Sequence, residues 1–285
     1  MKRSVLTGLL VAGLAVVWMV ACNGGSRDAS AFTTAGVNHL QKGDYDRAIR
    51  DFDRAIALQP GLVVAWKNRG LAYRNKGDFE RALADYDQAI LLTPGDARLY
   101  NDRGIVYTSM NDLTRAIRDF DQAITLKPDH ALAIKNRGRT HFYLGNFAQA
   151  AADLQRGLSL DSTNAYVVIW LHMARQRLKQ DDSADFVSHL AATDTTRWPA
   201  PVARYFLGTL SADSLRALAV ESNSDVQKDQ RCAAAFYIGE ATLLRGQRNE
   251  AAPLFQETRA SCPKDWTEYM AASAELQRLR PSGTQ

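Results

Sequence analysis

The sequence repeats itself every 34 residues between residues 48 and 150, and this period limits how the chain can fold. The recurring groups are Asn68-Arg69-Gly70, Asp102-Arg103-Gly104 and Asn136-Arg137-Gly138, the alanines Ala48, Ala82, Ala116 and Ala150, and the prolines Pro60, Pro94 and Pro128. A period of this size holds one supersecondary unit, and such units bury their apolar surface by stacking on their neighbours. We therefore expect a stacked array of similar units.

Residues 63–96 illustrate how one unit is built. Trp66, Gly70 and Tyr73 are spaced so that they share one face of a helix. Gly70 on this helix and Ala82 on the next are small, so two antiparallel helices can approach each other closely. Glycine inside a helix normally costs about 1 kcal/mol, so its recurrence needs a packing reason of this kind. The recurrent proline then prevents the second helix from continuing.

This pattern resembles the tetratricopeptide repeat, which implies an all-α fold, a superhelix of helical hairpins known as an α-solenoid. We expect four repeats over residues 31–164. The period is lost over residues 165–231, which we expect to be degenerate helical repeats that act as a linker. A further repeat is expected over residues 232–265, then a capping helix over 266–280 and a tail over 281–285.

The N-terminal segment has the layout of a processing signal. Lys2 and Arg3 precede an uncharged apolar run that ends in Met19-Val20-Ala21-Cys22. This ending resembles the bacterial lipobox. The resemblance implies a signal peptide over residues 1–21, lipidation of Cys22 with acyl chains such as palmitate, and a flexible tether over residues 22–30. The alternative is an uncleaved membrane anchor, since the apolar run is close to the minimum length that spans a bilayer.

The residue after the cysteine is Asn23 and not Asp, which under the sorting pattern of enterobacterial lipoproteins implies the outer membrane, with the protein facing the periplasm. The formal net charge of +4 falls to +2 once Lys2 and Arg3 leave with the signal peptide. So small a charge on a secreted chain argues against nucleic acid as a partner.

Motifs for catalysis and metal binding are missing from the sequence. It contains no H-E-x-x-H, G-x-S-x-G or P-loop pattern, and no cysteine or histidine cluster at zinc spacing. We therefore expect no catalytic residues, no metal and no cofactor. An enzyme whose catalytic residues are dispersed along the chain is the alternative.

The resemblance to tetratricopeptide repeats places positions 2, 5, 9, 12 and 13 of each repeat on a concave face. No acidic residue occupies these positions in the four repeats, whereas the second helices are rich in aspartate. A basic groove of this kind suits an extended acidic peptide; the alternative is a set of solvated charges without a partner. A chaperone-type carboxylate clamp is disfavoured, because it needs Asn at position 9. The expected groove residues are Lys67, Arg74, Asn75, Arg98, Asn101, Lys135, Arg139, Phe142 and Tyr143.

Two further pairings are expected from the repeat pattern. Cys232 and Cys262 begin and end the last hairpin, so their thiols could meet and form a disulfide in an oxidising periplasm. Two free buried thiols are the alternative. The recurring arginines Arg69, Arg103 and Arg137 are expected to pair with aspartates of neighbouring helices.

The C-terminal third resembles the NlpI-type lipoproteins of the bacterial envelope. The resemblance depends on three blocks, Trp170-Leu171-His172, Phe206-Leu207-Gly208 and Phe236-Tyr237-Ile238-Gly239. It implies a non-catalytic outer-membrane scaffold that can dimerise and that brings peptidoglycan hydrolases together with a periplasmic protease or with synthesis machinery. The cysteine pair departs from the family pattern, so partner identity is not transferred intact. A pilotin-like or outer-membrane-assembly lipoprotein is the alternative.

Overall fold

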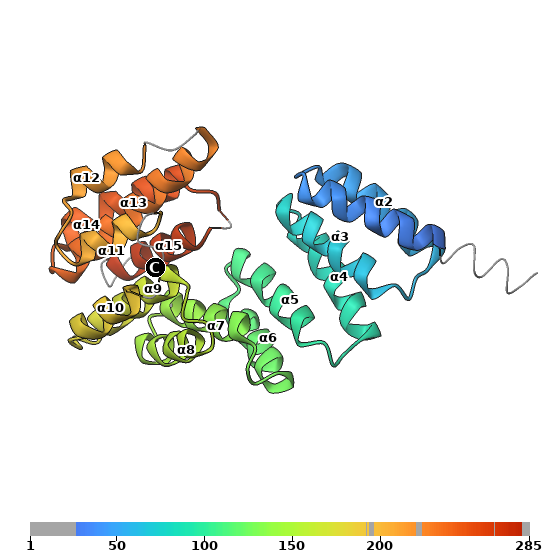
Figure 1. Cartoon of the computed structure of the whole chain (residues 1–285), viewed down its shortest axis with the longest axis horizontal. Helices are drawn as coiled ribbons and strands as arrows, with labels where there is room; N and C mark the ends of the chain where they lie inside the picture. Colours follow the sequence, from blue (N-terminus) through green and yellow to red (C-terminus); the bar gives the residue numbers. More distant parts are fainter. Residues whose placement is uncertain (1–26, 192, 194–196, 221–223, 265, 281–285) are drawn as a thin grey trace, which may run out of the picture. The chain divides into compact units, whose positions relative to one another are not determined.

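The computed structural model describes residues 27–191, 193, 197–220, 224–264 and 266–280, and all regular secondary structure in these ranges is helical (Figure 1). The signal segment, Cys22 and the C-terminal tail, for which the sequence makes predictions, lie outside the described residues. No helix in the described ranges is long and apolar enough to cross a bilayer. The chain divides into two compact units, residues 1–106 and 107–285, which are described separately below.

The first unit is a series of helical hairpins. It contains a helix over residues 27–41, then α2 (Tyr45–Leu58), α3 (Val63–Asn75), α4 (Phe79–Leu92) and most of α5 (Ala97–Ser109), whose last residues belong to the second unit. The helices of a hairpin pack closely where small residues meet. A Cβ on Gly70 would lie 3.3 Å from the carbonyl oxygen of Ala82, and Ala82 itself has no exposed surface. These contacts confirm the packing role predicted for the recurrent small residues.

The turn inside each hairpin also follows the 34-residue period. Its last residue before the cap has a positive φ and is Gly43, Gly77, Asn111 or Gly145. Glycine and asparagine adopt this conformation at the lowest steric cost. In the first three of these turns an aspartate follows and caps the second helix, its carboxylate accepting from a backbone N–H: Asp44 from Arg47, Asp78 from Arg81 and Asp112 from Arg115.

The recurring arginines connect successive hairpins. Arg69 donates to both carboxylate oxygens of Asp85, at 2.9 and 2.7 Å, and its third nitrogen donates to Asp53 of the preceding hairpin at 2.5 Å. Asp85 is buried, so this bidentate contact satisfies a carboxylate that water cannot reach. Equivalent contacts are Arg103–Asp87, Arg137–Asp121 and Arg137–Asp153. The predicted arginine–aspartate pairing is confirmed, and it neutralises many of the aspartates on the second helices.

The second unit contains the remaining helices of the array. They are α6 (Leu113–Leu126), α7 (Ala131–Leu144), α8 (Phe147–Leu160), α9 (Ala165–Arg177), α10 (Ser183–Leu190), α11 (Ala200–Phe206), α12 (Ala212–Leu218), α13 (Ser224–Leu244), α14 (Arg248–Ser261) and α15 (Thr267–Leu279). The hairpin expected from residue 232 is formed by α13 and α14, and α13 begins earlier, at Ser224. A disulfide between Cys232 and Cys262 joins α13 to the end of α14.

The core of the second unit is aromatic. Trp170 of α9 is buried, with its ring 5.1 Å from the ring of Phe142 on α7 and 5.7 Å from that of Phe236 on α13. One tryptophan thus connects three helices that are far apart in sequence. Edge-to-face and stacked pairs of this kind stabilise a core beyond the apolar area they bury.

Four charged side chains form a cluster next to this core, and the two carboxylates among them are buried. Arg177 of α9 lies 2.8 Å from Glu240 of α13 and 2.8 Å from Glu275 of α15, and Glu275 also pairs with Arg278. Glu240 and Glu275 are almost completely buried. Burial, followed by repulsion from Glu275, raises the pKa of Glu240 to about 7. This four-residue ion cluster holds α15 against the rest of the unit.

Candidate peptide-binding site

The first unit contains five of the predicted groove residues, on α3 and α5. Lys67, Arg74 and Asn75 lie on or at the end of α3, and Arg98 and Asn101 lie on α5. Asn101 is buried and donates to Asp102 at 3.2 Å. Arg98 is paired at 2.7 and 2.9 Å with both carboxylate oxygens of Asp96.

Two carboxylates, Asp96 and Asp102, lie beside the predicted groove residues of this unit. Burial raises the pKa of Asp102, while Asn101, Arg74 and Lys67 act in the opposite direction. Arg98 holds the pKa of Asp96 below its ordinary value. Three cations therefore share the surface with two carboxylates. No acidic residue occupies the predicted groove positions themselves, so the basic groove stays a prediction for this unit. Asp96 and Asp102 reach this surface because they are close in sequence to Arg98 and Asn101.

The second unit contains the other four predicted residues, and two of them are buried in its core. Phe142 and Tyr143 have exposed fractions of 0% and 4%, so they offer no surface to a peptide. The prediction that they line a groove is wrong because both rings pack against Trp170 of α9, and α15 also lies against α7 at this point. The Arg278 guanidinium of α15 donates to the backbone carbonyl of Tyr143 at 2.8 Å. The C-terminal helix of the chain itself therefore covers the groove of the fourth repeat.

The remaining two residues, Lys135 and Arg139, lie one helical turn apart on α7. Lys135 is buried and pairs with Asp161 at 2.5 Å, so its charge is already matched. Arg139 is half-buried and donates to the side-chain amide oxygen of Asn136. Within the ranges that the structure describes, no carboxylate lies within ion-pairing distance of Arg139.

Lys135 and Arg139 both line a hollow of about 590 Å³ between α7, α9 and the start of α15, called the α7–α9 hollow below. Its walls include Leu132, Lys135, Asn136, Arg139, Asn164, Tyr166, Val167, Trp170, Trp198, Trp266, Thr267 and Glu268. Leu132 is 61% exposed and Tyr166 is 40% exposed, and Trp198 and Trp266 are half-buried. A volume of this size, with a wall that combines aromatic and aliphatic side chains with several polar ones, is compatible with a ligand-binding site.

The acidic residue of the hollow, Glu268, is already provided with hydrogen-bond donors. Its Oε1 accepts from the Tyr237 hydroxyl at 3.0 Å, and its Oε2 accepts from the Thr267 hydroxyl at 2.8 Å. Because Tyr237 is buried beside this carboxylate, its pKa is raised well above the ordinary value and it remains a donor. Glu268 therefore holds the first turn of α15 in place.

Most of the aromatic wall of this hollow could not be predicted from the sequence. Trp198 precedes α11 and Trp266 caps α15, and both are far in sequence from α7. Only the fold brings them together. A signal was available for Leu132 and Tyr166, because both occupy the second position of their repeat units, which the concave-face pattern includes.

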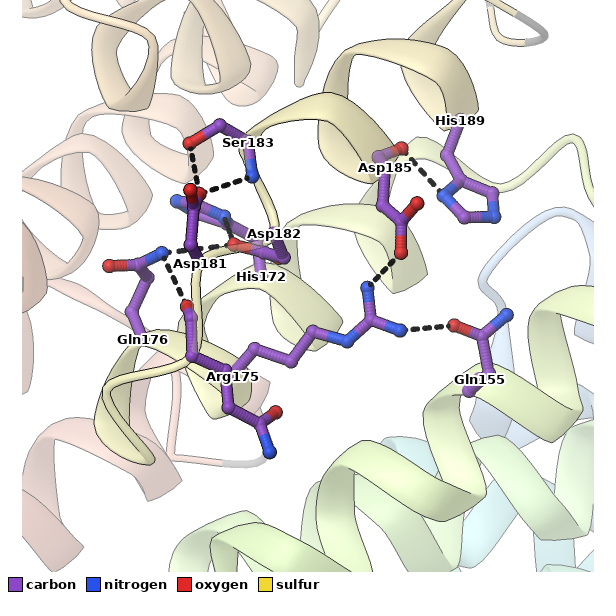
Figure 2. Close-up of polar contacts among 10 residues, drawn as sticks. Gln155, His172, Arg175, Gln176, Asp181, Asp182, Ser183, Asp185 and His189 are labelled. Atoms are coloured by element: carbon purple, nitrogen blue, oxygen red, sulfur yellow. Dashed lines mark hydrogen bonds and ion pairs between the residues drawn. The ribbon is translucent and has the colours of Figure 1, made fainter.

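A second polar cluster lies at the junction of α9 and α10 (Figure 2). It contains a His–Asp pair of the kind found in catalytic sites, but both side chains are buried. His172 Nδ1 lies 2.9 Å from Asp182, and Gln176 donates to the same carboxylate oxygen at 2.9 Å. His172 is buried and stacked on Phe186 with ring centroids 4.1 Å apart. Burial lowers the pKa of His172 against the opposing effect of Asp182, so the ring is neutral near pH 7.

The same junction is fixed by Arg175, which donates to Asp185 of α10 at 3.1 Å and to Gln155 of α8 at 2.7 Å (Figure 2). The cluster thus joins three helices. Within the described parts of the chain, no group of three His, Cys, Asp or Glu side chains is arranged to hold a metal ion.

Comparisons with known proteins agree with the repeat assignment. A sequence profile described as Tetratricopeptide repeat matches residues 33–97 and 101–165, and a second profile with the same description matches residues 72–129. The chain is 30% identical over 128 residues to the Lipoprotein NlpI homolog of Haemophilus influenzae, which corresponds to 44% of this chain. The match spans only 41% of that relative. The predicted tetratricopeptide repeats and the predicted likeness to NlpI-type lipoproteins are confirmed.

Solved structures show the same fold at low identity. A tetratricopeptide repeat protein from Parabacteroides merdae superimposes with a TM-score of 0.60 at 15% identity, over 88% of this chain and 99% of that one. A structure from the functional characterization of Pseudomonas aeruginosa pilF gives 0.56 at 14% identity, over 87% and 99%. At these identities the likeness establishes the fold alone, and it confirms the predicted all-α solenoid of helical hairpins.

Proposed function

Because residues 33–165 are tetratricopeptide repeats within an all-helical solenoid, we propose that this protein is a non-catalytic adaptor that binds protein or peptide partners in the bacterial envelope. The observation that carries the proposal is the α7–α9 hollow. It combines solvent-exposed Leu132 and Tyr166 with Arg139, a cation that is paired with no carboxylate of the described residues, on a helical frame. Large apolar side chains that gather in a concave, polar-rimmed surface are characteristic of recognition sites.

An adaptor of this kind is expected to catalyse no reaction itself. The His172–Asp182 pair is enclosed by packed rings, and we infer that it serves to join helices. The purified protein alone should therefore show no hydrolysis of peptidoglycan or of unfolded protein substrates. Turnover that survives repurification and is lost in His172→Gln would contradict a purely adaptor function.

The proposed position of the adaptor is the outer membrane, facing the periplasm, with lipid on Cys22. The likeness to a lipoprotein over 128 residues supports this part of the proposal. Cys22→Ala should release the protein into the soluble periplasmic fraction, whereas Cys232→Ala/Cys262→Ala should leave it with the membrane. Membrane retention of Cys22→Ala would refute lipid anchoring and favour an uncleaved helical anchor.

The proposed partners are peptidoglycan hydrolases and a periplasmic protease. A photo-crosslinking amino acid at Leu132 of the full chain, followed by mass spectrometry of the adducts, tests this directly. Val187 of α10 is the matched control, since it is apolar, 52% exposed and outside the walls of the hollow. Envelope enzymes captured from Leu132 and not from Val187 are expected. Identical adducts from both positions, or none, would refute the hollow as the binding surface.

The alternative is a pilotin-like or outer-membrane-assembly lipoprotein. Deletion of the gene distinguishes the two. Loss of a secretin multimer or of an outer-membrane protein with normal cell-wall turnover would favour the alternative. Altered cell-wall turnover with normal outer-membrane assembly is the result expected for the adaptor.

A further inference from the structure

The proposed function leaves the chemistry of the bound segment open, and the polar groups of the α7–α9 hollow restrict it. Lys135 is matched by Asp161, and Glu268 is matched by two hydroxyls. Among the residues that the structure describes, the only hydrogen-bond acceptor of Arg139 is an amide oxygen, that of Asn136. The charge that the hollow can offer to a ligand is therefore the guanidinium of Arg139.

A smaller cavity of about 340 Å³ adjoins the hollow and extends it. The two share Asn164, Tyr166 and Trp198 in their walls. The smaller one adds Arg197 and also Asp161, whose carboxylate is matched by Lys135. Arg197 is exposed, and within the described residues it makes no ion pair. The two cavities form a continuous trough in which an aromatic and aliphatic middle has an arginine toward each end.

The apolar middle of the trough would be costly to leave in water. Leu132 and Tyr166 project into solvent, and the two tryptophans next to them are only half-buried. An aromatic or large aliphatic side chain would cover all four. Arginine pairs strongly with carboxylates through paired N–H donors, so carboxylates on either side of that side chain would match the ends.

From this arrangement we propose that the trough binds an extended partner segment in which one large apolar side chain is flanked by carboxylates on both sides. The apolar side chain enters between Leu132, Trp198 and Trp266. The flanking carboxylates reach Arg139 and Arg197. This inference rests on the adaptor function proposed above and specifies the ligand of the same surface.

Fluorescence anisotropy with labelled peptides and the full chain in detergent tests the proposal. The probe is the peptide Asp-Glu-Phe-Glu-Asp; the comparison peptides replace Phe by Ser, or every acidic residue by Lys. Saturable binding of the first peptide is expected, with at least tenfold weaker binding of the other two. Added salt should weaken the binding, because the charge pairs lie at a partly exposed surface.

Variants locate the binding. Leu132→Ser, Arg139→Gln and Arg197→Gln should each weaken the affinity about tenfold, and all three change side chains that lie at the surface or in the wall of the trough. Val187→Ser and Arg118→Gln are the controls, since both residues are exposed and outside the trough. Equal binding of the lysine peptide, or equal losses in the controls, would overturn the ligand assignment.

The outcomes separate this inference from the adaptor function. If crosslinking from Leu132 captures envelope proteins while the acidic peptide fails to bind, the ligand assignment is wrong and the adaptor stands. If crosslinking from Leu132 captures a second copy of the same chain, the trough is a dimer surface and the assignment is also wrong. Peptide binding that the trough variants abolish supports the assignment.

Discussion

The buried ion cluster predicts an unusual dependence of stability on pH. Folding raises the pKa of Glu240 from its ordinary value of 4.5 to about 7, first through burial and then through repulsion from Glu275. The folded state therefore binds this proton more tightly than the unfolded chain does. The stabilisation that results is fully present below pH 4.5 and is lost as the pH rises through 7.

The magnitude follows from the two pKa values. Their difference corresponds to about 3 kcal/mol, of which about 2.5 kcal/mol falls between pH 5 and pH 8. Glu240→Gln has a side chain that is neutral throughout. The free energy of unfolding of this variant should therefore increase relative to the wild type by about 2.5 kcal/mol across that range. Urea unfolding followed by helical circular dichroism at pH 5, 6, 7 and 8 measures the difference.

The matched control is Glu257→Gln, because Glu257 of α14 is half-exposed and is paired with Arg216. This pairing lowers the pKa of Glu257, so the carboxylate is ionised in both states over most of the range and the control should show little pH dependence. A difference between Glu240→Gln and wild type that is constant with pH would refute the reasoning. It would mean that Arg177 keeps Glu240 ionised in the folded protein.

Three further predictions concern stability. Cys232 and Cys262 are 30 residues apart, so the chain-entropy relation predicts that reducing their disulfide lowers the free energy of unfolding by about 3.7 kcal/mol. The melting temperature should fall accordingly. The double alanine variant should be insensitive to reductant. Gly36→Ala places a Cβ 2.6 Å from the buried ring of Phe52 and should lower the free energy of unfolding, measured in urea, by about 1 to 3 kcal/mol. Gly61→Ala is the control, because the space around Gly61 is open, and it should lower the same quantity by less than about 1 kcal/mol. Arg69→Ala should lower the free energy of unfolding by about 3 to 5 kcal/mol, because it leaves the buried carboxylate of Asp85 unpaired. A second substitution that removes Asp85 as well should recover part of this loss. No recovery would contradict the pairing.

The repeat period made the hairpins and the arginine contacts predictable. Both depend on interactions within one repeat or between neighbours, so Arg69 and its aspartates could be paired from spacing alone. The groove of the fourth repeat could not be predicted in this way, because α15 reaches it from 135 residues away along the chain.

A trace of that contact does exist in the sequence. The last two groove positions are Arg74 and Asn75 in the second repeat but Phe142 and Tyr143 in the fourth. A change from polar to aromatic side chains at equivalent positions indicates that something covers them. It does not indicate which segment does so.

The contact between Arg278 and the Tyr143 carbonyl also has a consequence for biosynthesis. At about 5 to 20 residues per second, α15 leaves the ribosome about 7 to 27 s after Tyr143. The rings of Phe142 and Tyr143 can pack on Trp170 before then, because α9 follows α7 closely in the sequence. The contact between α7 and α15 is therefore among the last that the chain can form.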